Sequence, residues 1–510
     1  MINLTEIKEE TLNQYPELNN VVYKMHEKEV RVVLRNCDVI DPENINHYIA
    51  KNGYFGLEKA LSISQTDVID EMKKSGLRGR GGGGFPTGRK WEFAYNNESD
   101  IKYIICNADE GDPGAFMDRS VLEKDPHSVI EGMIIAGYSI GASTGYVYVR
   151  AEYPLAAKRL QKAIDDALEK GILGNQVLGS DYSFNIEIRL GAGAFVCGEE
   201  TALIASIEGE RGMSRIKPPY PAAKGLFGKP TIINNVETLS NVPQIIFNGY
   251  EWFRGFGTEE SPGTKVFALA GKVKYNGLIE VPMGITLGEI IHEIGKGVGR
   301  KRTFKAVLTG GPSGGCLTEK HLHESVDFDN LVKLGSMMGS GGMIVLNDHD
   351  CMVDIAKFYL DFSVDESCGK CTPCREGTVQ MYKLLEKITN GEGSVNDIDK
   401  LRDLSISVKE SSLCGLGMTA PNPVLSTLEH FYDEYLEHVN DKRCKSSSCK
   451  GLISEYFITD KCTGCTICAR RCPVQCISGT LKEQHTIDES ICIRCGECFA
   501  SCNFDAIITK

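Results

Sequence analysis

The sequence has little of what marks an exported or membrane-spanning protein. Its longest apolar runs are interrupted by charged residues or glycine well before they could cross a bilayer. The start of the chain, residues 1–6, lacks the basic stretch and apolar core of a signal peptide, so we expect a cytoplasmic protein. Basic charge is also in short supply, since 56 Lys and Arg against 69 Asp and Glu give a net charge of −13. That balance argues against nucleic acid as a partner.

Histidine is scarce too, with ten residues, and no Ser-His-Asp or Cys-His arrangement for nucleophilic catalysis is evident. Cysteine, by contrast, is abundant, with 20 residues in a chain of 510. In a chain without an export signal, so many thiols indicate reduced metal ligands rather than disulfides. The length implies about three to five domains.

Eight of the cysteines form two runs near the C-terminus. Each run reads Cys-x-x-Cys-x-x-Cys-x-x-x-Cys, the spacing that holds two [4Fe–4S] clusters, with the fourth cysteine of each run binding the other cluster. The predicted ligand sets are Cys462, Cys465, Cys468 and Cys502 for one cluster, and Cys492, Cys495, Cys498 and Cys472 for the other. Zinc sites or disulfides are the alternative, but two matched runs favour clusters. The protein is therefore expected to move single electrons.

The order of sequence patterns predicts a multidomain chain of α/β and α+β parts. Strands such as 103–105 and 146–149 alternate with helices such as 155–168, which indicates a layered α/β domain. The predicted parts are an N-terminal segment (1–60) with a strand at Val30–Leu34, an α/β domain (61–258), an α+β module (259–347), a helix bundle (348–441), and a polar linker with a ferredoxin-like domain (442–510). In the bundle, the helical period predicts that Ile355, Phe358, Tyr359 and Phe362 share one buried face.

The densest glycine cluster lies between Gly76 and Trp91. Its Gly79, Gly81 and Gly84 fit the pattern G-x-G-x-x-G, but the pattern follows a predicted helix rather than a strand, so the standard dinucleotide fingerprint is rejected. Glycines still let backbone N–H groups approach a phosphate or a flat ring, and the lysine that follows adds positive charge. A ligand loop is therefore preferred to a flexible surface loop.

Two further loops come directly after predicted strands. The loop at 106–116 is acidic, and its Asn and Asp side chains could bind flavin ring nitrogens or ribityl hydroxyls, because α/β ligands bind at the carboxyl ends of strands. Composition alone would also fit a solvated acidic turn. The loop at 191–201 leads into a helix whose first N–H groups would suit an anion.

Together, the three loops resemble the flavin-bearing, NADH-oxidising subunit of respiratory complex I and its diaphorase relatives. The resemblance runs from about residue 53 to residue 439 and includes the motif at 367–377. It implies a Rossmann-like flavin domain, a ubiquitin-like (SLBB) domain, a helical-bundle Fe–S domain and, beyond the complex I subunit, a C-terminal 2[4Fe–4S] ferredoxin domain. It also implies a third [4Fe–4S] cluster, to which the C-x-x-C-x-x-C spacing adds support. Its ligands would be Cys368, Cys371, Cys374 and Cys414.

The resemblance further assigns the residues of a flavin site and a dinucleotide site. The FMN positions correspond to Gly79, Gly81, Lys90, Asn107, Asp109, Glu110, Gly198, Glu199, Asn234 and Asn235. The NADH positions correspond to Phe85, Lys90, Phe93, Asp112, Glu200 and Tyr220. The adenine is expected among the aromatic rings and the nicotinamide on the flavin. Glu200 should repel the 2′-phosphate of NADP, so NAD(H) is the expected substrate.

Within the family, the sequence looks closest to the beta subunit of multimeric electron-bifurcating [FeFe]-hydrogenases. Asp112 stands where complex I usually has Glu, Phe195 stands where it usually has Tyr, and the ferredoxin-like tail is an addition. Many members of that branch carry an N-terminal thioredoxin-like [2Fe–2S] domain, for which residues 1–60 are too few. We therefore expect that cluster on a partner subunit, with a larger catalytic hydrogenase-type subunit and ferredoxin as further partners.

Two other functions are weighed against this one. The diaphorase could instead serve an NAD-linked formate dehydrogenase or another ferredoxin:NAD(P) oxidoreductase. Alternatively, the chain could carry clusters without an active flavin, although the set Lys90, Asn107, Asp109 and Glu200 argues against that.

Eight cysteines remain outside the three predicted clusters. Five are interpreted as single buried thiols, namely Cys37, Cys106, Cys197, Cys316 and Cys351. Cys476 is interpreted as packing near a cluster. Cys444 and Cys449 lie in the polar linker, with His430 and His438 upstream. A zinc site at a hinge and a pair of unpaired surface thiols fit these two cysteines equally well.

Overall fold

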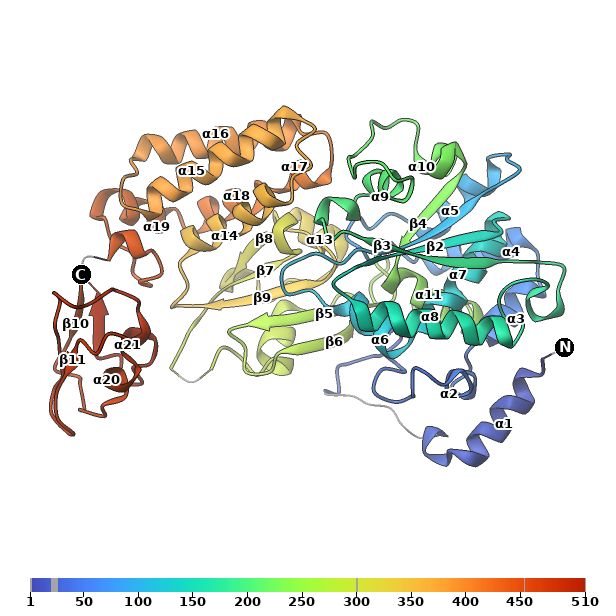
Figure 1. Cartoon of the computed structure of the whole chain (residues 1–510), viewed down its shortest axis with the longest axis horizontal. Coiled ribbons are helices and arrows are strands. Elements are labelled where there is room, and N and C mark those ends of the chain that lie inside the picture. The colour runs from blue at the N-terminus through green and yellow to red at the C-terminus, as the bar shows by residue number, and fades with distance from the viewer. Residues whose placement is uncertain (1, 20–25, 300, 454, 510) are drawn as a thin grey trace.

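The computed structural model describes residues 2–19, 26–299, 301–453 and 455–509. In Figure 1 a parallel sheet with its helices occupies one end of the long axis, and a small C-terminal unit occupies the other. A second sheet and a group of helices lie between them. Within the described residues, no helix is both long enough and apolar enough to cross a membrane.

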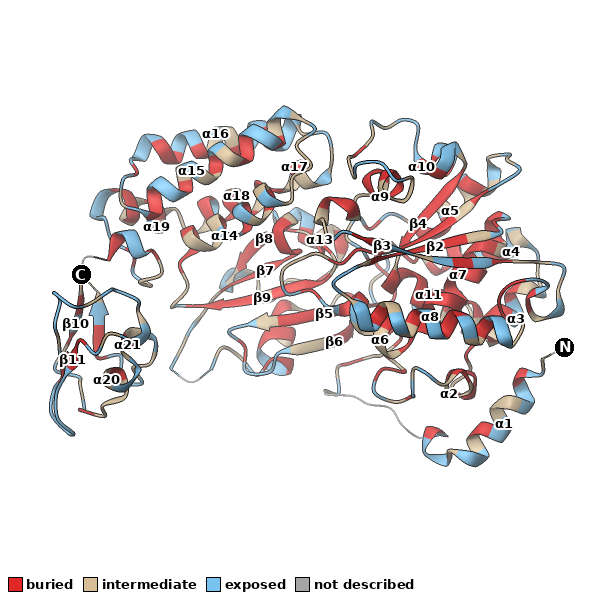
Figure 2. Cartoon of the chain, in the orientation of Figure 1, coloured by how far each residue is buried: buried red, intermediate tan, exposed pale blue. Residues whose placement is uncertain are grey.

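A four-stranded parallel sheet in the order β3-β2-β1-β4 organises the first part of the chain. Its strands are β1 (Tyr103–Ala108), β2 (Thr144–Arg150), β3 (Asn185–Gly191) and β4 (Thr231–Asn235). The helices around it are α3 (Phe55–Leu61), α4 (Gln65–Ser75), α5 (Thr87–Asn96), α6 (Met117–Lys124), α7 (Pro126–Ile140), α8 (Pro154–Glu169), α9 (Glu200–Ile207), α10 (Pro221–Lys224), α11 (Val236–Asn248) and α12 (Tyr250–Arg254). The helix α7 is buried on almost every side (Figure 2), as an apolar central helix should be.

The helix predicted ahead of the glycine loop is confirmed, with the ends that its sequence indicates. Ser64 caps the first turn of α4 by accepting the N–H of Asp67 at 3.1 Å, and Gly76 ends the helix with φ of 68°. The glycine loop therefore follows a helix and leads into α5, which agrees with the rejection of the standard dinucleotide fingerprint.

The N-terminal part contains α1 (Leu4–Gln14) and α2 (Ile45–Ala50), but the strand predicted at Val30–Leu34 is wrong. These residues form bends instead. The buried carboxylate of Glu280 accepts the N–H groups of Val33 at 3.0 Å and Leu34 at 2.8 Å. Because one side chain satisfies two neighbouring N–H groups, the segment turns around it and cannot pair as a strand.

The second sheet has five strands in the order β6-β5-β9-β7-β8, with only the β5–β9 pair parallel. Its strands are β5 (Thr264–Gly271), β6 (Gly277–Pro282), β7 (Phe304–Thr309), β8 (Gly315–Thr318) and β9 (Gly342–Asn347). A π-helical turn spans Glu289–Ile294, and α13 (Phe328–Lys333) precedes β9.

Buried charges join the two sheets. Lys265 on β5 pairs with Glu237 on α11 at 2.5 Å, and the two side chains are 0% and 2% exposed. Arg80 of the glycine loop is also fully buried and donates to the carbonyl oxygens of Thr264 at 3.0 Å and Pro262 at 2.7 Å. Burial lowers the pKa of Arg80 to about 10. The glycine loop is thereby fixed to the start of the second sheet.

Six helices follow the second sheet: α14 (Met352–Asp365), α15 (Thr378–Thr389), α16 (Val395–Ser411), α17 (Gly415–Thr419), α18 (Asn422–His430) and α19 (Tyr432–Leu436). The face predicted to be buried in α14 is partly wrong. Tyr359 is buried, but Phe358 is 53% exposed, and the buried stripe instead includes Ala356, Leu360 and Ser363. The helix is rotated from the prediction because its inner surface packs on α15 and α18.

The C-terminal unit is small and rich in cysteine. It contains the strands β10 (Tyr456–Ile458), β11 (Ile477–Ser478), β12 (Thr486–Ile487) and β13 (Ile507–Thr509), with the helices α20 (Ile467–Arg471) and α21 (Glu497–Ala500). β10 pairs with β13 and β11 pairs with β12, both antiparallel. Because β10 and β13 are the first and last elements, their pairing closes the unit.

Candidate flavin, dinucleotide and metal sites

Asparagines at the carboxyl ends of β1 and β4 bring two of the predicted loops together. The parallel register sets Asn107 opposite Asn235. The Asn107 amide donates to the carbonyl oxygen of Gly198 at 2.9 Å, and its side-chain oxygen accepts the N–H of Asp109 at 3.0 Å. The acidic loop and the 191–201 loop therefore meet at one edge of the sheet, as expected for an α/β ligand site.

The neighbouring asparagines fix this edge to the surrounding helices. Asn234 accepts the indole N–H of Trp91 on α5 at 2.9 Å. Asn235 caps α11 by accepting the N–H of Thr238 at 3.2 Å, and it donates to Asp118 on α6 at 2.6 Å. Both side chains thus hold the strand end in place.

Asp109 provides a test of whether these residues fit FMN. Its carboxylate is buried, and neither oxygen has a hydrogen-bond partner among the described residues. Burial, partly offset by Arg150, raises the pKa of Asp109 to about 7. Glycines leave space nearby, since a Cβ on Gly81 would lie 2.9 Å from Cβ of Asn235, and one on Gly198 would lie 3.4 Å from the Asp109 carbonyl oxygen. A buried acceptor without a donor, in a glycine-lined space, fits a flavin that brings its own N–H and O–H donors.

Two other carboxylates predicted to bind FMN are engaged at helix starts. Glu110 accepts the N–H groups of Asp118 at 3.0 Å and Arg119 at 3.1 Å, and burial raises its pKa to about 7. Glu199 caps α9 by accepting the N–H of Thr201 at 2.9 Å. Both carboxylates therefore lie near the predicted FMN residues, but each already accepts backbone N–H groups at the start of a helix, α6 for Glu110 and α9 for Glu199.

A cavity of about 860 Å³ lies between the end of the glycine loop, α5 and the start of α9. The residues that line it are Phe85, Lys90, Phe93, Asn96, Asn97, Glu200 and the segment from Pro218 to Ala223. The rings of Phe85 and Phe93 lie 6.4 Å apart, and the ring of Tyr220 is well exposed. Gly79 donates its N–H to the Phe85 carbonyl oxygen at 2.9 Å, which joins the glycine loop to this cavity. The volume and the exposed rings suit a dinucleotide.

Glu200 lies in this cavity between two lysines. Lys90 approaches its carboxylate at 3.2 Å and Lys217 at 2.6 Å. Burial alone would raise the pKa of Glu200, but the two lysines outweigh it and leave the pKa below its usual value. Lys217 was not predicted as a site residue, because it lies 17 positions from Glu200 in a proline-rich loop without a recognisable motif.

The predicted cysteines of the third cluster converge at the start of the helix group. Burial and the proximity of Cys368, Cys371 and Cys414 raise the pKa of Cys374 to about 11. The hydroxyl of Ser367 lies 3.2 Å from the Cys374 sulfur. Four thiols brought together in this way suit a [4Fe–4S] cluster.

This cysteine loop packs against the 191–201 loop of the first domain. The N–H of Phe195 donates to Glu366 at 2.7 Å, and the ring of Phe195 contacts the ring of Phe362 with centroids 5.3 Å apart. Lys370 donates to the carbonyl oxygen of Ser214 at 2.6 Å. Cys368 also packs with the apolar residues around Cys197. The cysteine loop and the 191–201 loop are therefore in direct contact.

In the C-terminal unit each of the two predicted ligand sets lines a space of its own. One enclosed space of about 20 Å³ is lined by the sulfur ligands Cys462, Cys465, Cys468 and Cys502. A second, of about 10 Å³, is lined by Cys472, Cys492, Cys495 and Cys498. Cys476 also borders the second space, with its sulfur 3.4 Å from that of Cys472. The donor sets fit two [4Fe–4S] clusters.

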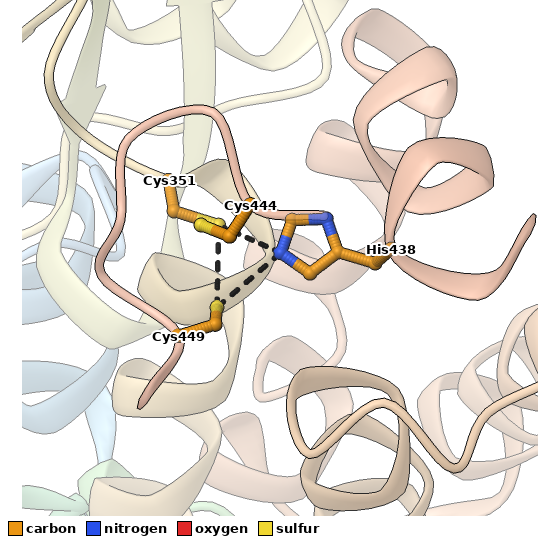
Figure 3. Close-up of side chains that lie close together, drawn as sticks. All are labelled: Cys351, His438, Cys444 and Cys449. Atoms are coloured by element: carbon orange, nitrogen blue, oxygen red, sulfur yellow. Dashed lines mark hydrogen bonds between the residues drawn. The ribbon is translucent and has the colours of Figure 1, made fainter. Parts of the chain in front are cut away.

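A further group of ligands lies between the helix group and the C-terminal unit (Figure 3). The ligand atoms of Cys351, His438, Cys444 and Cys449 all lie within 4.8 Å of one another, and all four residues are buried. His438 Nε2 is 3.4 Å from the sulfur of Cys351 and 3.3 Å from that of Cys449. Hydrogen bonds from Cys351 and Cys449 lower the pKa of Cys444 below its usual value.

This group bears on three sequence-based interpretations. Cys444 and Cys449 are not surface thiols, since they are 3% and 2% exposed. Cys351, interpreted as a single buried thiol, belongs to the group. Of the two upstream histidines, His438 joins it, whereas His430 contacts His321, with ring centroids 5.4 Å apart and the ring planes tilted by 58°.

Known protein families and relatives match large parts of the chain. The family model "Nuo51 FMN-binding domain" matches residues 72–244, "NADH-ubiquinone oxidoreductase-F iron-sulfur binding region" matches 354–438, and "4Fe-4S binding domain" matches 455–478. The NADP-reducing hydrogenase subunit HndC of Solidesulfovibrio fructosivorans is 58% identical over 95% of this chain and 98% of its own length. An F-type subunit of the NADH-quinone oxidoreductase of Rhizobium meliloti is 46% identical over 81% of this chain and 98% of its own.

Solved structures agree with these relatives. An NAD⁺-reducing [NiFe]-hydrogenase in its H₂-reduced state matches with a TM-score of 0.71 and 34% identity. That match covers 84% of this chain and 70% of the hydrogenase chain.

Proposed function

The chain belongs to the family of F-type subunits of NADH-quinone oxidoreductases and their hydrogenase-linked relatives, and from that premise we propose that it is the diaphorase subunit of a hydrogenase-type complex. It is an NAD(P)H oxidoreductase with FMN and iron–sulfur domains. Bound FMN supplies the conversion of a two-electron hydride transfer into single-electron steps. The chain binds the flavin at the β1–β4 edge, orients the dinucleotide in the adjacent cavity, and leads electrons away through its thiolate-held clusters.

The observation that carries this proposal is the position of Asp109. Its buried carboxylate lacks a donor within the described residues, and its backbone lies against Gly198 of the 191–201 loop, which leads to Glu200 of the dinucleotide-sized cavity. A buried carboxylate without a donor is costly, so a ligand that supplies one stabilises the site. This favours an active flavin over a chain that only carries clusters.

The partner is proposed to be a hydrogenase-type catalytic subunit. The 58% identical relative and the similar structures are parts of hydrogenases, which favours this partner over a formate dehydrogenase. We propose a thioredoxin-like [2Fe–2S] subunit as a second partner and ferredoxin as a third, reached through the C-terminal clusters. We propose electron bifurcation that involves NAD(H) and ferredoxin as the activity of the complex.

We propose three [4Fe–4S] clusters on the three cysteine sets and keep the predicted domain limits of 61–258, 259–347, 348–441 and 442–510. The first of these is assigned as Rossmann-like on its parallel sheet, and the second as ubiquitin-like (SLBB) on its mixed five-stranded sheet. The thiols required as reduced ligands support a cytoplasmic location.

We also propose that Cys351, His438, Cys444 and Cys449 bind zinc. A tetrahedral site with Zn–S of about 2.3 Å and Zn–N of about 2.1 Å has edges of about 3.6 to 3.8 Å. The sulfurs of Cys351 and Cys449 are 3.7 Å apart, and the nitrogen–sulfur distances of 3.3 and 3.4 Å are close to these edges. His438 Nδ1 lies 2.7 Å from the Glu434 carbonyl oxygen, which orients Nε2 toward the thiols. Three thiolates and one imidazole form a structural zinc set.

Asp109→Ala tests the flavin site. The parent protein should bind one FMN and about twelve iron atoms per chain, counting four for each cluster. The variant should bind FMN about 10- to 100-fold more weakly, because it loses hydrogen bonds to a charged group. Fluorescence of FMN released on denaturation measures occupancy. The flavin-free variant should be no less stable to heat than the flavin-free parent, since an unsatisfied buried carboxylate has been removed.

Tyr220→Ala is the matched control for that experiment. Its ring lines the dinucleotide cavity and is 61% exposed, so the variant should keep FMN and mainly raise KM for NADH. If Asp109→Ala retains FMN with unchanged affinity, or if the parent protein's flavin is not bleached by NADH, the proposed site is wrong.

Glu200 should set the preference between the two dinucleotides. Its carboxylate should repel a 2′-phosphate, so the parent protein should use NADH better than NADPH. In Glu200→Gln, Lys90 loses its ion-pair partner and Lys217 keeps only its pair with Glu199, so the ratio of kcat/KM for NADPH to that for NADH should rise at least about tenfold. Glu208→Gln is the control, since Glu208 lies at the C-terminal end of α9, whereas Glu200 begins that helix, and Glu208 pairs with Arg215. A parent protein that prefers NADPH would contradict the assignment.

A further inference from the structure

Two loops of the second sheet converge on a carboxylate of the flavin side. The hydroxyl of Ser340 donates to Asp112 at 2.5 Å. A Cβ on Gly311 would lie 3.2 Å from the Asp112 carboxyl carbon, so the glycine leaves room for that carboxylate. Ser340 belongs to the 335–341 loop before β9, and Gly311 to the turn after β7. The setting of Asp112 is therefore built by residues about 200 positions away in the chain.

The backbone of Ser340 is itself held rigidly. Its carbonyl oxygen accepts from Lys265 at 2.7 Å, and Lys265 forms the buried pair with Glu237. Glu237 is in the first turn of α11, two residues after Asn235 of the proposed FMN site. The buried pair of Lys265 and Glu237, which lies close to the proposed FMN site, thus fixes the position of Ser340. A donor held in this way can orient its acceptor without losing conformational entropy in each catalytic cycle.

The same loop also touches the glycine loop. A Cβ on Gly82 would lie 3.4 Å from backbone atoms of Gly339, so the two backbones are in van der Waals contact. The 335–341 loop therefore contacts both the glycine loop, at Gly82, and Asp112.

We propose that Ser340 is a positioning residue for hydride exchange: it fixes the carboxylate of Asp112, which the sequence resemblance assigns to the dinucleotide, and the second sheet thereby completes the site. This inference rests on the proposed diaphorase function. A hydroxyl donor at 2.5 Å makes a charge-assisted bond that both restricts the side chain and favours its ionised form.

The ionisation of Asp112 depends strongly on this bond. Burial raises the pKa of Asp112 to about 6, and the Ser340 hydroxyl and N–H oppose that rise. The other titratable groups that interact with Asp112 are Glu110 on its own loop and Tyr359 on α14. Neither is a cation, so the serine is the group that favours the charged form. Its loss should raise the pKa of Asp112 further.

Ser340→Ala tests the inference in the complete FMN-loaded protein. We expect kcat/KM for NADH to fall about tenfold, mainly through KM, and the acid limb of its pH profile to move up by about one pH unit. Ser340→Thr keeps the hydroxyl and should restore both values. Ser336→Ala is the matched control in the same loop, because its hydroxyl bonds Thr309 and Gly315 instead. It should leave the pH profile unchanged.

A double-mutant cycle separates positioning from simple support of the fold. In an Asp112→Asn background, Ser340→Ala should have no further effect on kcat/KM. An equal loss in both backgrounds, or an unchanged KM and pH profile in Ser340→Ala alone, would overturn the inference while leaving the diaphorase function standing. A parent protein whose flavin is not reduced by NADH would instead overturn the proposed function and this inference with it.

Discussion

Replacing Cys371 by serine should leave reduction of the flavin by NADH intact and abolish electron transfer to every downstream acceptor. Two contacts join the cysteine loop at 368–374 to the flavin domain: Glu366 accepts the N–H of Phe195, and Lys370 donates to the Ser214 carbonyl oxygen. The cluster proposed there should therefore be the first acceptor of electrons from the flavin. The residues that line the dinucleotide cavity and the Asn107–Gly198 hydrogen bond beside Asp109 do not involve Cys371, so these contacts are kept in the variant. Hydride exchange and onward transfer should therefore separate cleanly.

Stopped-flow absorbance measures the two steps apart. Flavin bleaching by NADH should keep its rate, while reduction of ferredoxin should be lost, and the iron content should fall by about four of about twelve atoms. Cys316→Ser is the control, because Cys316 is a buried thiol on β8 whose surroundings include no cluster ligand. Slow flavin bleaching in Cys371→Ser would mean that the cluster supports the flavin site structurally rather than carrying electrons.

Local spacing predicted the parts of this protein in which the ligands are close in sequence. The spacing within the two C-terminal runs was enough to predict which cysteines lie together. In a run of this kind the first three cysteines bind one cluster and the fourth binds the other, so the ligand sets can be read from the sequence. The cap residues Ser64 and Gly76 likewise fixed the ends of α4. In each case the information lies within a few residues of the feature.

Features that depend on contacts across the fold were not accessible from the sequence. Cys351 is 87 residues from His438, Lys217 reaches Glu200 from a loop without a motif, and Ser340 reaches Asp112 from another sheet. The exposed Phe358 shows the same limit within one helix. Apolar spacing predicts that a face exists, but the neighbours of α14 decide which face it is.

Zinc should be present at one ion per chain, and Cys351→Ser should lose it. The start of α14, the turn at His438 and the segment that leads to the C-terminal unit all contribute to this one group. Structural zinc contributes about 10 to 16 kcal/mol of binding free energy in small domains, so losing it should release the segment at 441–453. Reduction of ferredoxin should then fall, because the C-terminal clusters are no longer held at a fixed place, while flavin bleaching by NADH continues.

Metal analysis and hydrogen exchange test this directly. Cys351→Ser and the pair Cys444→Ser/Cys449→Ser should both lack zinc and show faster exchange at 441–453, whereas Cys37→Ser, at a buried thiol far from the group, should keep the metal and the parent's exchange. The variants should retain iron at the three cluster sets, since none of those cysteines is changed. If the parent protein binds no zinc, and the pair variant keeps full transfer from NADH to ferredoxin, the four residues are only a packed group of polar side chains. The expected loss arises because three thiols and an imidazole packed this closely are stabilised by a shared cation that deprotonates the thiols.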